Sequence, residues 1–194
     1  GLYSNIYSFT VAEPASGLKP TAMSISFDDS PTSLKFNYMT PGEHTGTVIQ
    51  IVEKSRFDGS FQNAASYRGT DSESYIIDQD LPAMVRTHSV SVKGLKPGVT
   101  YVYRFMDTAG RASEAFEMVW PDTSKQYSFL FLTDPQAANA ASYSVYGNAL
   151  ERAYAVAKNP AFVILGGDMV DRGNNRSQWI CFLTIPRGYL PGFP

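Results

Sequence analysis

Between about residues 20 and 120, apolar side chains recur at every second position, and this alternation constrains the fold more than any other feature of the chain. A period of two places successive side chains on opposite faces of a β-strand. Residues rich in Gly, Pro, Asp and Ser separate the runs and suit turns. The pattern predicts short strands in an antiparallel β-sandwich. The alternating runs are 23–27, 34–38, 48–52, 88–92, 101–105 and 116–120.

The segment from Leu95 to Tyr101 makes the predicted sandwich more specific. Pro97 follows Leu95 by two residues and Tyr101 follows it by six. This is the spacing of a tyrosine corner, in which a tyrosine hydroxyl binds the backbone ahead of its own strand. In this respect the chain resembles a fibronectin type III domain. The segment from Phe57 to Ile77 is polar instead, and we expect it to be a long excursion on the sandwich surface.

A different pattern follows Trp120. Residues 127–132 and 161–165 are apolar runs suited to strands that are covered on both faces. Between them, apolar residues recur at helical spacing from Val145 to Ala157. A strand, a helix and a strand in this order predict a βαβ unit with parallel strands.

The length of the chain agrees with one whole domain and part of another. At roughly 150 residues per domain, 194 residues amount to about 1.3 domains. We predict a sandwich domain over 1–120, a linker over 121–126, the beginning of an α/β domain over 127–179 and an atypical tail over 180–194. The expected fold class is therefore mainly β, an antiparallel sandwich followed by a partial α/β segment.

The composition excludes several kinds of partner and bond. The 16 basic and 18 acidic residues give a formal net charge of -2, without the basic surplus that nucleic-acid binding requires. No run of about 20 apolar residues is present to span a membrane. A single cysteine, Cys181, excludes an internal disulfide, and we interpret it as a small core residue. Burial alone must therefore hold the core together.

Polar residues follow both predicted strands of the βαβ unit. They are Asp134 and Gln136 after the first strand, and Asp168, Asp171 and Arg172 after the second. The carboxyl ends of parallel strands meet at one sheet edge, where α/β proteins bind ligands. Two carboxylates there repel each other unless a cation lies between them, and oxygen ligands suit Mg, Mn, Fe or Zn. Singly, each acid has a structural alternative as a helix cap or in a turn with an ion pair. Together they favour a metal site.

Two of these segments resemble the motifs of a known family. Asp134-Pro135-Gln136 and Gly167-Asp168-Met169-Val170-Asp171 are similar to the first two motifs of calcineurin-like metallophosphoesterases. With a sandwich in front of them, the chain resembles the beginning of a purple acid phosphatase. The resemblance implies that Asp134 binds one metal ion, that Asp168 bridges two, and that Gln136 is a further ligand. It places Asp171 and Arg172 beside the ligands or the substrate.

The same resemblance implies a function and a location. The family hydrolyses phosphate monoesters with a metal-bound hydroxide, so the implied cofactors are two divalent or trivalent ions of Fe, Zn or Mn. It also implies that the protein is secreted or otherwise outside the cytoplasm. The alternative interpretation is a non-catalytic extracellular sandwich that binds or supports another molecule.

The chain departs from the family pattern at several positions. Gln136 replaces the usual His, and Asp171 replaces the Tyr that colours the purple enzymes, so we expect no purple chromophore. The later Gly-Asn-His motif is absent, and the two histidines, His44 and His88, both precede the acidic segments. We therefore expect partial or no metal binding and no catalysis by this chain. Because the resemblance is to a family of metal-dependent hydrolases, the sequence leaves open whether the protein is an enzyme. Our hypothesis is a premature end, from a frameshift or a partial gene model, with residues 180–194 not native to the family.

The remaining expectations concern packing. We expect His88 to pack against the sandwich surface and His44 to be solvated in its turn. A two-strand unit with one helix cannot cover its own apolar strands. We therefore expect Phe129, Phe131, Phe162, Ile164 and the tail to pack on the sandwich or on another molecule, which includes self-association.

Overall fold

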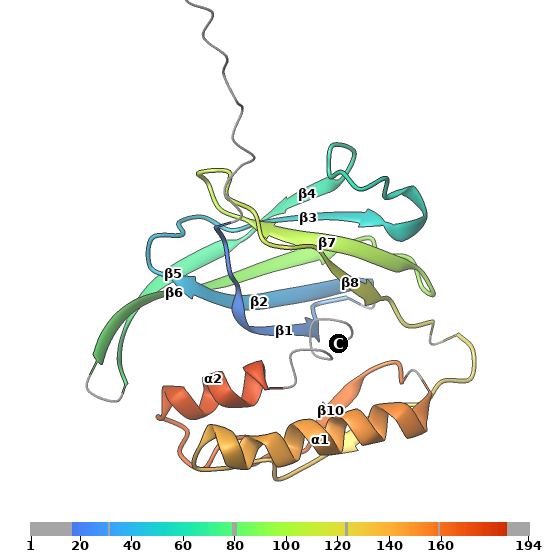
Figure 1. Ribbon diagram of the computed structural model, residues 1–194. Helices are drawn as coiled ribbons and strands as arrows, with labels where there is room; N and C mark the ends of the chain where they lie inside the picture. The colour runs from blue at the N-terminus through green and yellow to red at the C-terminus, as the bar shows by residue number, and fades with distance from the viewer. Residues whose placement is uncertain (1–16, 31, 79–80, 123, 159, 186–194) are drawn as a thin grey trace, which may run out of the picture.

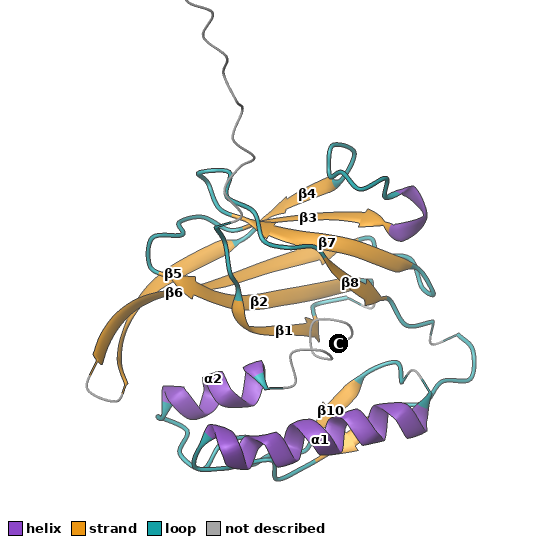
Figure 2. Cartoon of the chain, viewed as in Figure 1, coloured by secondary structure: helices purple, strands orange, loops and turns teal. Residues whose placement is uncertain are grey.

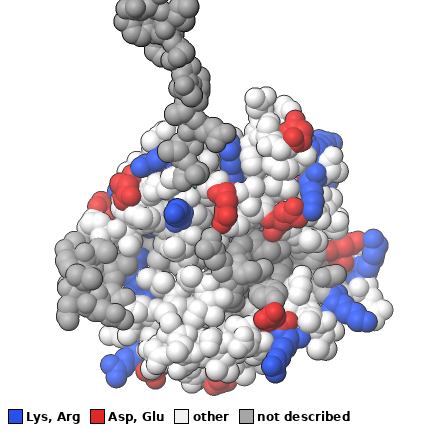
Figure 3. Space-filling view, viewed as in Figure 1, with Lys and Arg blue, Asp and Glu red and all other residues white. Residues whose placement is uncertain are grey.

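The structure is a computed structural model, and it describes residues 17–185 except 31, 79–80, 123 and 159. The strands of the two larger sheets gather in one part of the molecule, and the two described α-helices lie beside it together with a short strand pair (Figures 1 and 2). No helix among the described residues is long and apolar enough to cross a membrane. On the face drawn in Figure 3, acidic and basic side chains are interspersed.

The larger part is a β-sandwich of two four-stranded antiparallel sheets, as predicted. The first sheet has the order β1 (Thr21–Phe27), β2 (Ser33–Pro41), β6 (Leu81–Lys93) and β5 (Thr70–Asp78). The second has the order β4 (Ala65–Arg68), β3 (Val48–Glu53), β7 (Thr100–Met106) and β8 (Phe116–Val119). A short 3₁₀ helix, η1 (Lys54–Arg56), follows β3.

The inward-facing members of the alternating runs form the core between the two sheets. Phe36 on β2 meets Tyr103 on β7 with ring centroids 5.0 Å apart, and Tyr38 stacks on Phe105 at 4.0 Å. All four side chains are at most 1% exposed. The tyrosine corner is also present, because the Lys96 backbone N–H donates to the Tyr101 hydroxyl over 2.9 Å. The period-two pattern therefore located the core correctly.

The expected excursion at 57–77 is wrong, because β4 and most of β5 lie in this segment. Both are edge strands, so their side chains are largely polar and do not alternate in the way that core strands do. Gly69 lies between them, where the chain passes from one sheet to the other. A Cβ there would lie 2.0 Å from the Ser89 carbonyl oxygen, so only glycine fits this crossing.

Both histidines are buried, so the prediction that His44 is solvated is wrong. His44 is 3% exposed, and its Nδ1 lies 3.0 Å from a carboxylate oxygen of Asp107. Burial alone would raise the pKa of Asp107, but hydrogen bonds from His44 and Arg111 outweigh it and lower that pKa. These bonds link the turn after β2 to the turn after β7.

His88 lies inside the sandwich rather than against its surface. It is 2% exposed and stacks on Tyr38 with ring centroids 4.4 Å apart. Nε2 lies 2.8 Å from the Thr40 hydroxyl, and Nδ1 lies 2.8 Å from the Thr47 hydroxyl, which donates onward to the Thr70 carbonyl. Both ring nitrogens are therefore satisfied by neutral partners, and burial lowers the pKa of His88 to about 4.

The smaller part contains the predicted βαβ unit. β9 (Leu130–Leu132) and β10 (Val163–Leu165) pair in parallel, and α1 (Ala140–Ala157) connects them. The Asn139 side chain caps α1 by accepting from the Ser142 backbone N–H. A second core forms around this unit from the buried side chains of Leu130, Tyr143, Tyr146, Leu150 and Phe182.

A second helix, α2 (Arg176–Thr184), continues the unit and lies beside β1 of the sandwich (Figure 1). The boundary predicted at 179/180 falls inside this helix, and Phe182 belongs to the second core. Because α2 contacts both α1 and β1, its apolar residues do not form one stripe, which concealed it in the sequence. Residues 186–194 of the predicted tail lie outside the described residues, and the other predicted boundaries stay predictions.

Candidate metal site

The two acidic loops lie side by side at the carboxyl edge of the β9–β10 pair. One loop begins after Leu132 and the other after Leu165. The Asp134 N–H donates to the Gly167 carbonyl over 3.2 Å, and the Gln136 N–H donates to the Asp168 carbonyl over 2.9 Å. The backbone therefore holds Asp134 and Asp168 on adjoining loops, as the parallel pairing predicts.

The Gln136 side chain strengthens this connection. With its amide nitrogen turned toward the two loops, it donates to the backbone carbonyls of Asp134 at 3.2 Å and Asp168 at 2.8 Å. The nitrogen thus joins the loops, and the amide oxygen is the only atom of this group that can ligate a cation. Its position in the sequence did not predict this structural role.

Both aspartates have a left-handed backbone conformation. The φ angle is +55° at Asp134 and +47° at Asp168. This conformation costs an L-residue about 1–2 kcal/mol, although Asp tolerates it better than most residues. Among the described non-glycine residues, a positive φ also occurs at Ala22 and at Lys158, the C-cap of α1. Strained backbone clusters at functional sites, and the other two such positions are those predicted to bind metal.

The side chains of Asp134, Gln136 and Asp168 are exposed. The Thr133 hydroxyl donates to an Asp134 carboxylate oxygen over 2.6 Å. This hydroxyl reduces the freedom of the carboxylate, and the sequence analysis missed it. A hydroxyl residue directly before a candidate ligand was the available signal.

The donor set is too small for a pair of metal ions. Within the described part of the chain, no three His, Cys, Asp or Glu side chains converge in a group that could hold a metal. Zn takes roughly four donor atoms and Mg roughly six. Two carboxylates and one amide oxygen cannot supply that number for two ions. The described residues by themselves therefore do not fit a dimetal centre.

Asp171 and Arg172 form the local ion pair that was the structural alternative for them. Arg172 Nε lies 3.7 Å from an Asp171 carboxylate oxygen, and both side chains are exposed. The Arg172 backbone N–H donates to the side-chain oxygen of the buried Gln178 over 2.8 Å. Gln178 thereby ties the loop to α2, and a substrate contact by Arg172 stays a prediction.

A hollow of about 530 Å³ lies beside the first loop. Asp134 and Gln136 line it from one side, and Ser142 and Tyr146 of α1 line it from another. Asp168 does not line it. The hollow therefore brings together two of the three candidate ligands.

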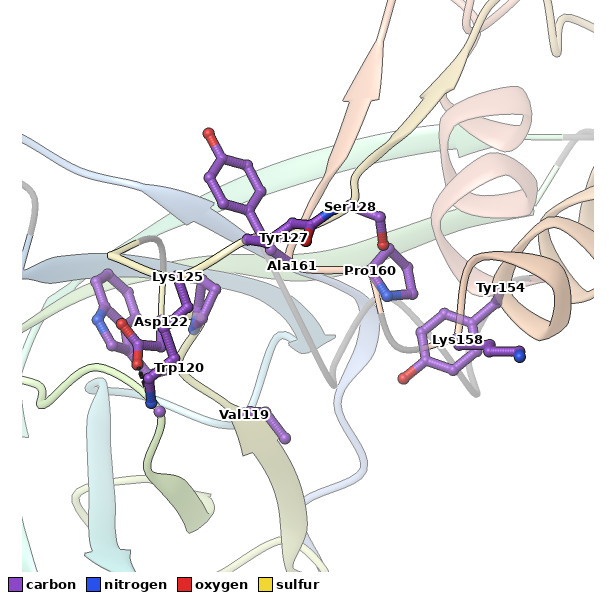
Figure 4. A pocket seen from close by; sticks show the side chains of 13 residues that line it. Val119, Trp120, Asp122, Lys125, Tyr127, Ser128, Tyr154, Lys158, Pro160 and Ala161 are labelled. Carbon is purple, nitrogen blue, oxygen red and sulfur yellow. Dashed lines mark ion pairs between the residues drawn. The ribbon is translucent and has the colours of Figure 1, made fainter.

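A larger cavity, of about 700 Å³, lies at the opposite edge of the β9–β10 pair (Figure 4). Its walls include Trp120 and Tyr127 from the connection to the sandwich and Tyr154 at the end of α1. Asp122 pairs with Lys125 there over 2.9 Å, and the Ser124 hydroxyl and the Lys125 ammonium together lower the pKa of Asp122 to about 2. This cavity is remote from the acidic loops.

The chain thus belongs to the class of proteins in which an antiparallel β-sandwich precedes an α/β segment. Comparison with known proteins identifies the family. The model of the purple acid phosphatase N-terminal domain matches residues 20–131, more than half of the chain. The chain therefore belongs to the purple acid phosphatase N-terminal domain family. Asp134, Gln136 and Asp168 lie beyond the matched residues.

One solved structure supports this fold. Purple acid phosphatase PPD1 from yellow lupin seeds matches with a TM-score of 0.70 and 12% identity, over 91% of this chain and 34% of the lupin chain. At this identity the match shows the fold alone, and the chain spans about a third of the lupin protein. Vertebrate Astrotactin-2 matches with a TM-score of only 0.32 and 14% identity, over 72% of this chain and 26% of its own, so the two folds differ. No curated protein sequence matches the chain.

Proposed function

We propose that this chain is the N-terminal part of a metal-dependent phosphoesterase that hydrolyses phosphate monoesters. One observation carries the proposal, namely two strained aspartates on cross-bonded loops at the carboxyl edge of a parallel strand pair. Membership of the purple acid phosphatase family supports it, because that family generally consists of dimetal enzymes. On the same ground we propose a location outside the cytoplasm.

In this proposal Asp134 and Asp168 are metal ligands and Gln136 is a weaker third ligand. A cation between the two carboxylates would relieve their mutual repulsion, and hard oxygen donors suit Fe, Mn and Zn. The remaining ligands of a dimetal centre would come from residues other than those described. We infer that the 194 residues alone bind metal weakly and do not catalyse hydrolysis.

The activity can be tested with p-nitrophenyl phosphate in the presence of Mn²⁺, Zn²⁺ or Fe³⁺. We expect no turnover above the metal-only background, because the donor set is incomplete. Metal-dependent turnover that disappears in Asp168→Ala would show that these residues are an enzyme by themselves, and would contradict the inference.

Metal binding needs a separate readout. Titration with Mn²⁺ should broaden backbone NMR signals of residues 133–136 and 166–169, and the paired change Asp134→Asn and Asp168→Asn should abolish the broadening. The control is Asp58→Asn, an exposed acid in the sandwich. Broadening that persists in the paired variant, or is absent from the unmodified chain, would contradict the proposed ligands.

A second function is favoured by the position of the family match, which falls mainly on the sandwich. In this alternative the sandwich binds or supports another molecule, and the acidic loops have no role. The Mn²⁺ titration separates the alternatives, because only the first requires Asp134 and Asp168.

A further inference from the structure

The second acidic loop, residues 166–173 after β10, is held by side chains from three other elements. The first acidic loop holds it at Asp168. Gln136 donates its backbone N–H to the Asp168 carbonyl over 2.9 Å, and its side-chain nitrogen, turned toward the loops, donates to the same carbonyl over 2.8 Å. Helices α1 and α2 hold the second loop at two points further along the chain.

Tyr143 of α1 holds the second loop directly beside Asp168. Its hydroxyl donates to the Met169 carbonyl over 3.1 Å. The Tyr143 side chain is fully buried in the second core, where its ring lies 6.5 Å from the ring of Phe182. A close-packed ring cannot follow a moving loop, so the bond fixes the Met169 carbonyl relative to α1. Because Met169 follows Asp168, the same bond restricts the backbone of Asp168.

Gln178 of α2 holds the far end of the second loop. Its side-chain oxygen accepts from the Arg172 N–H over 2.8 Å, and the residue is buried. Helix α2 in turn contacts β1, and Arg176 Nη2 lies 3.5 Å from the sulfur of Met39 on β2. The far end of the loop is therefore connected through α2 to the sandwich.

These bonds explain how Asp168 keeps its left-handed backbone, with φ at +47°. Strained backbone persists only where the surrounding structure over-determines it. Gln136 fixes the carbonyl of Asp168, and Tyr143 fixes the next carbonyl, that of Met169. A loop that already has its bound shape loses less conformational freedom when it binds a ligand. Side chains that hold this shape therefore contribute to affinity without contacting the ligand.

We propose that Tyr143 and Gln178 are positioning residues of the candidate metal site, which hold the second loop in its ligand-binding shape before a cation binds. Since it requires Asp168 to bind a cation, this positioning role rests on the proposed function. Both residues act through the loop backbone. Tyr143 makes the larger contribution, because its bond is made at the residue after Asp168, whereas the bond of Gln178 is made at Arg172.

Tyr143→Phe in the full 194-residue chain tests the larger contribution, because it removes the hydroxyl and retains the buried ring. Without metal, the amide hydrogens of Asp134 and Gln136, which bond to the second loop, should exchange faster than in the unmodified chain. With Mn²⁺, the Kd obtained from NMR broadening at 133–136 and 166–169 should rise. The expected factor is roughly two- to tenfold, which corresponds to the net contribution of one hydrogen bond.

The matched control is Tyr146→Phe, which makes the same change one turn further along α1. Tyr146 is also buried and stacks on Phe182 at 5.3 Å, but its hydroxyl has no hydrogen-bond partner among the described residues. We expect unchanged amide exchange and an unchanged Kd for Mn²⁺. Gln178→Met removes the other bond at similar side-chain size, and it should raise the Kd less than Tyr143→Phe does.

Several outcomes would overturn the positioning role. If Tyr143→Phe leaves either the amide exchange or the Kd for Mn²⁺ unchanged, the role is wrong and the proposed ligands still stand. An equal rise of the Kd in Tyr146→Phe would show that the cause is lost core stability rather than the bond to Met169. If Mn²⁺ does not broaden 133–136 and 166–169 in the unmodified chain, the proposed ligands are wrong and the positioning role fails with them.

Discussion

The sandwich and the βαβ unit differ in how completely each buries its own apolar surface. In the sandwich, side chains of both sheets fill a common core, and even its two histidines are buried with hydrogen-bond partners. In the smaller unit, Phe131 and Ile164 remain largely exposed beside a core of five buried residues. The part that carries the candidate site is therefore the less self-sufficient part.

The largest expected effect tests this difference directly. Phe36→Ala should reduce the free energy of unfolding by about 3–5 kcal/mol, because it leaves a cavity between the two sheets. Urea unfolding followed by the fluorescence of Trp120, which is buried in the same core, measures it.

The comparison variant is Phe182→Ala, which removes an equally buried ring from the second core. We expect it to increase hydrogen exchange in α1 and α2 and to leave the urea midpoint of the sandwich nearly unchanged. If Phe182→Ala lowers that midpoint as much as Phe36→Ala does, then the two parts unfold as one unit and the contrast is wrong.

An intermediate effect concerns acid stability of the sandwich. Burial lowers the pKa of His88 from 6.5 to about 4, so the unfolded chain takes up its proton first as the pH falls. The contribution of neutral His88 to the free energy of unfolding is complete above pH 6.5 and is lost progressively as the pH falls toward 4. Between pH 7 and pH 5 the loss is about 2 kcal/mol.

Urea midpoints at several pH values would show this dependence. In His88→Asn the difference between pH 7 and pH 5 should shrink by that amount, and in Lys54→Asn it should not. An identical pH dependence in the unmodified chain and in His88→Asn would exclude the effect.

The smallest expected effect concerns the strained loop of the βαβ unit. Asp168→Gly should be about 1 kcal/mol more stable than Asp168→Ala, because glycine adopts a positive φ without steric cost. Hydrogen exchange in β9 and β10 measures the difference locally. The control position is Asp171, which has no positive φ. There the glycine variant should be no more stable than the alanine variant. The same stability difference at both positions would contradict the strain at Asp168.

The elements predicted correctly from sequence are those whose signal is local. Alternation located the core strands, and the spacing of Leu95, Pro97 and Tyr101 located the tyrosine corner. The polar edge strands β4 and β5 were missed because their pairing depends on neighbouring strands rather than on a buried face. Helix α2 was missed because it packs on two sides.

The candidate site was predictable in location but not in detail. The order of strand, helix and strand was enough to place Asp134 and Asp168 on adjoining loops. The bridging amide of Gln136 depends on backbone atoms of both loops, which no local pattern reveals. Likewise, the burial of His44 depends on Asp107, 63 residues further along the chain.

The position of His88 also fixes how the sandwich is assembled. Its Nε2 lies 2.8 Å from the Thr40 hydroxyl and its Nδ1 lies 2.8 Å from the Thr47 hydroxyl, which donates to the Thr70 carbonyl. One imidazole ring thus joins three strands of the first sheet to the segment that leads into the second sheet. A slip of one residue in β2 or β6 would turn Thr40 or His88 to the opposite face of the sheet and break these contacts. The buried His88 ring therefore favours the native strand register over other registers that would bury a similar amount of apolar surface.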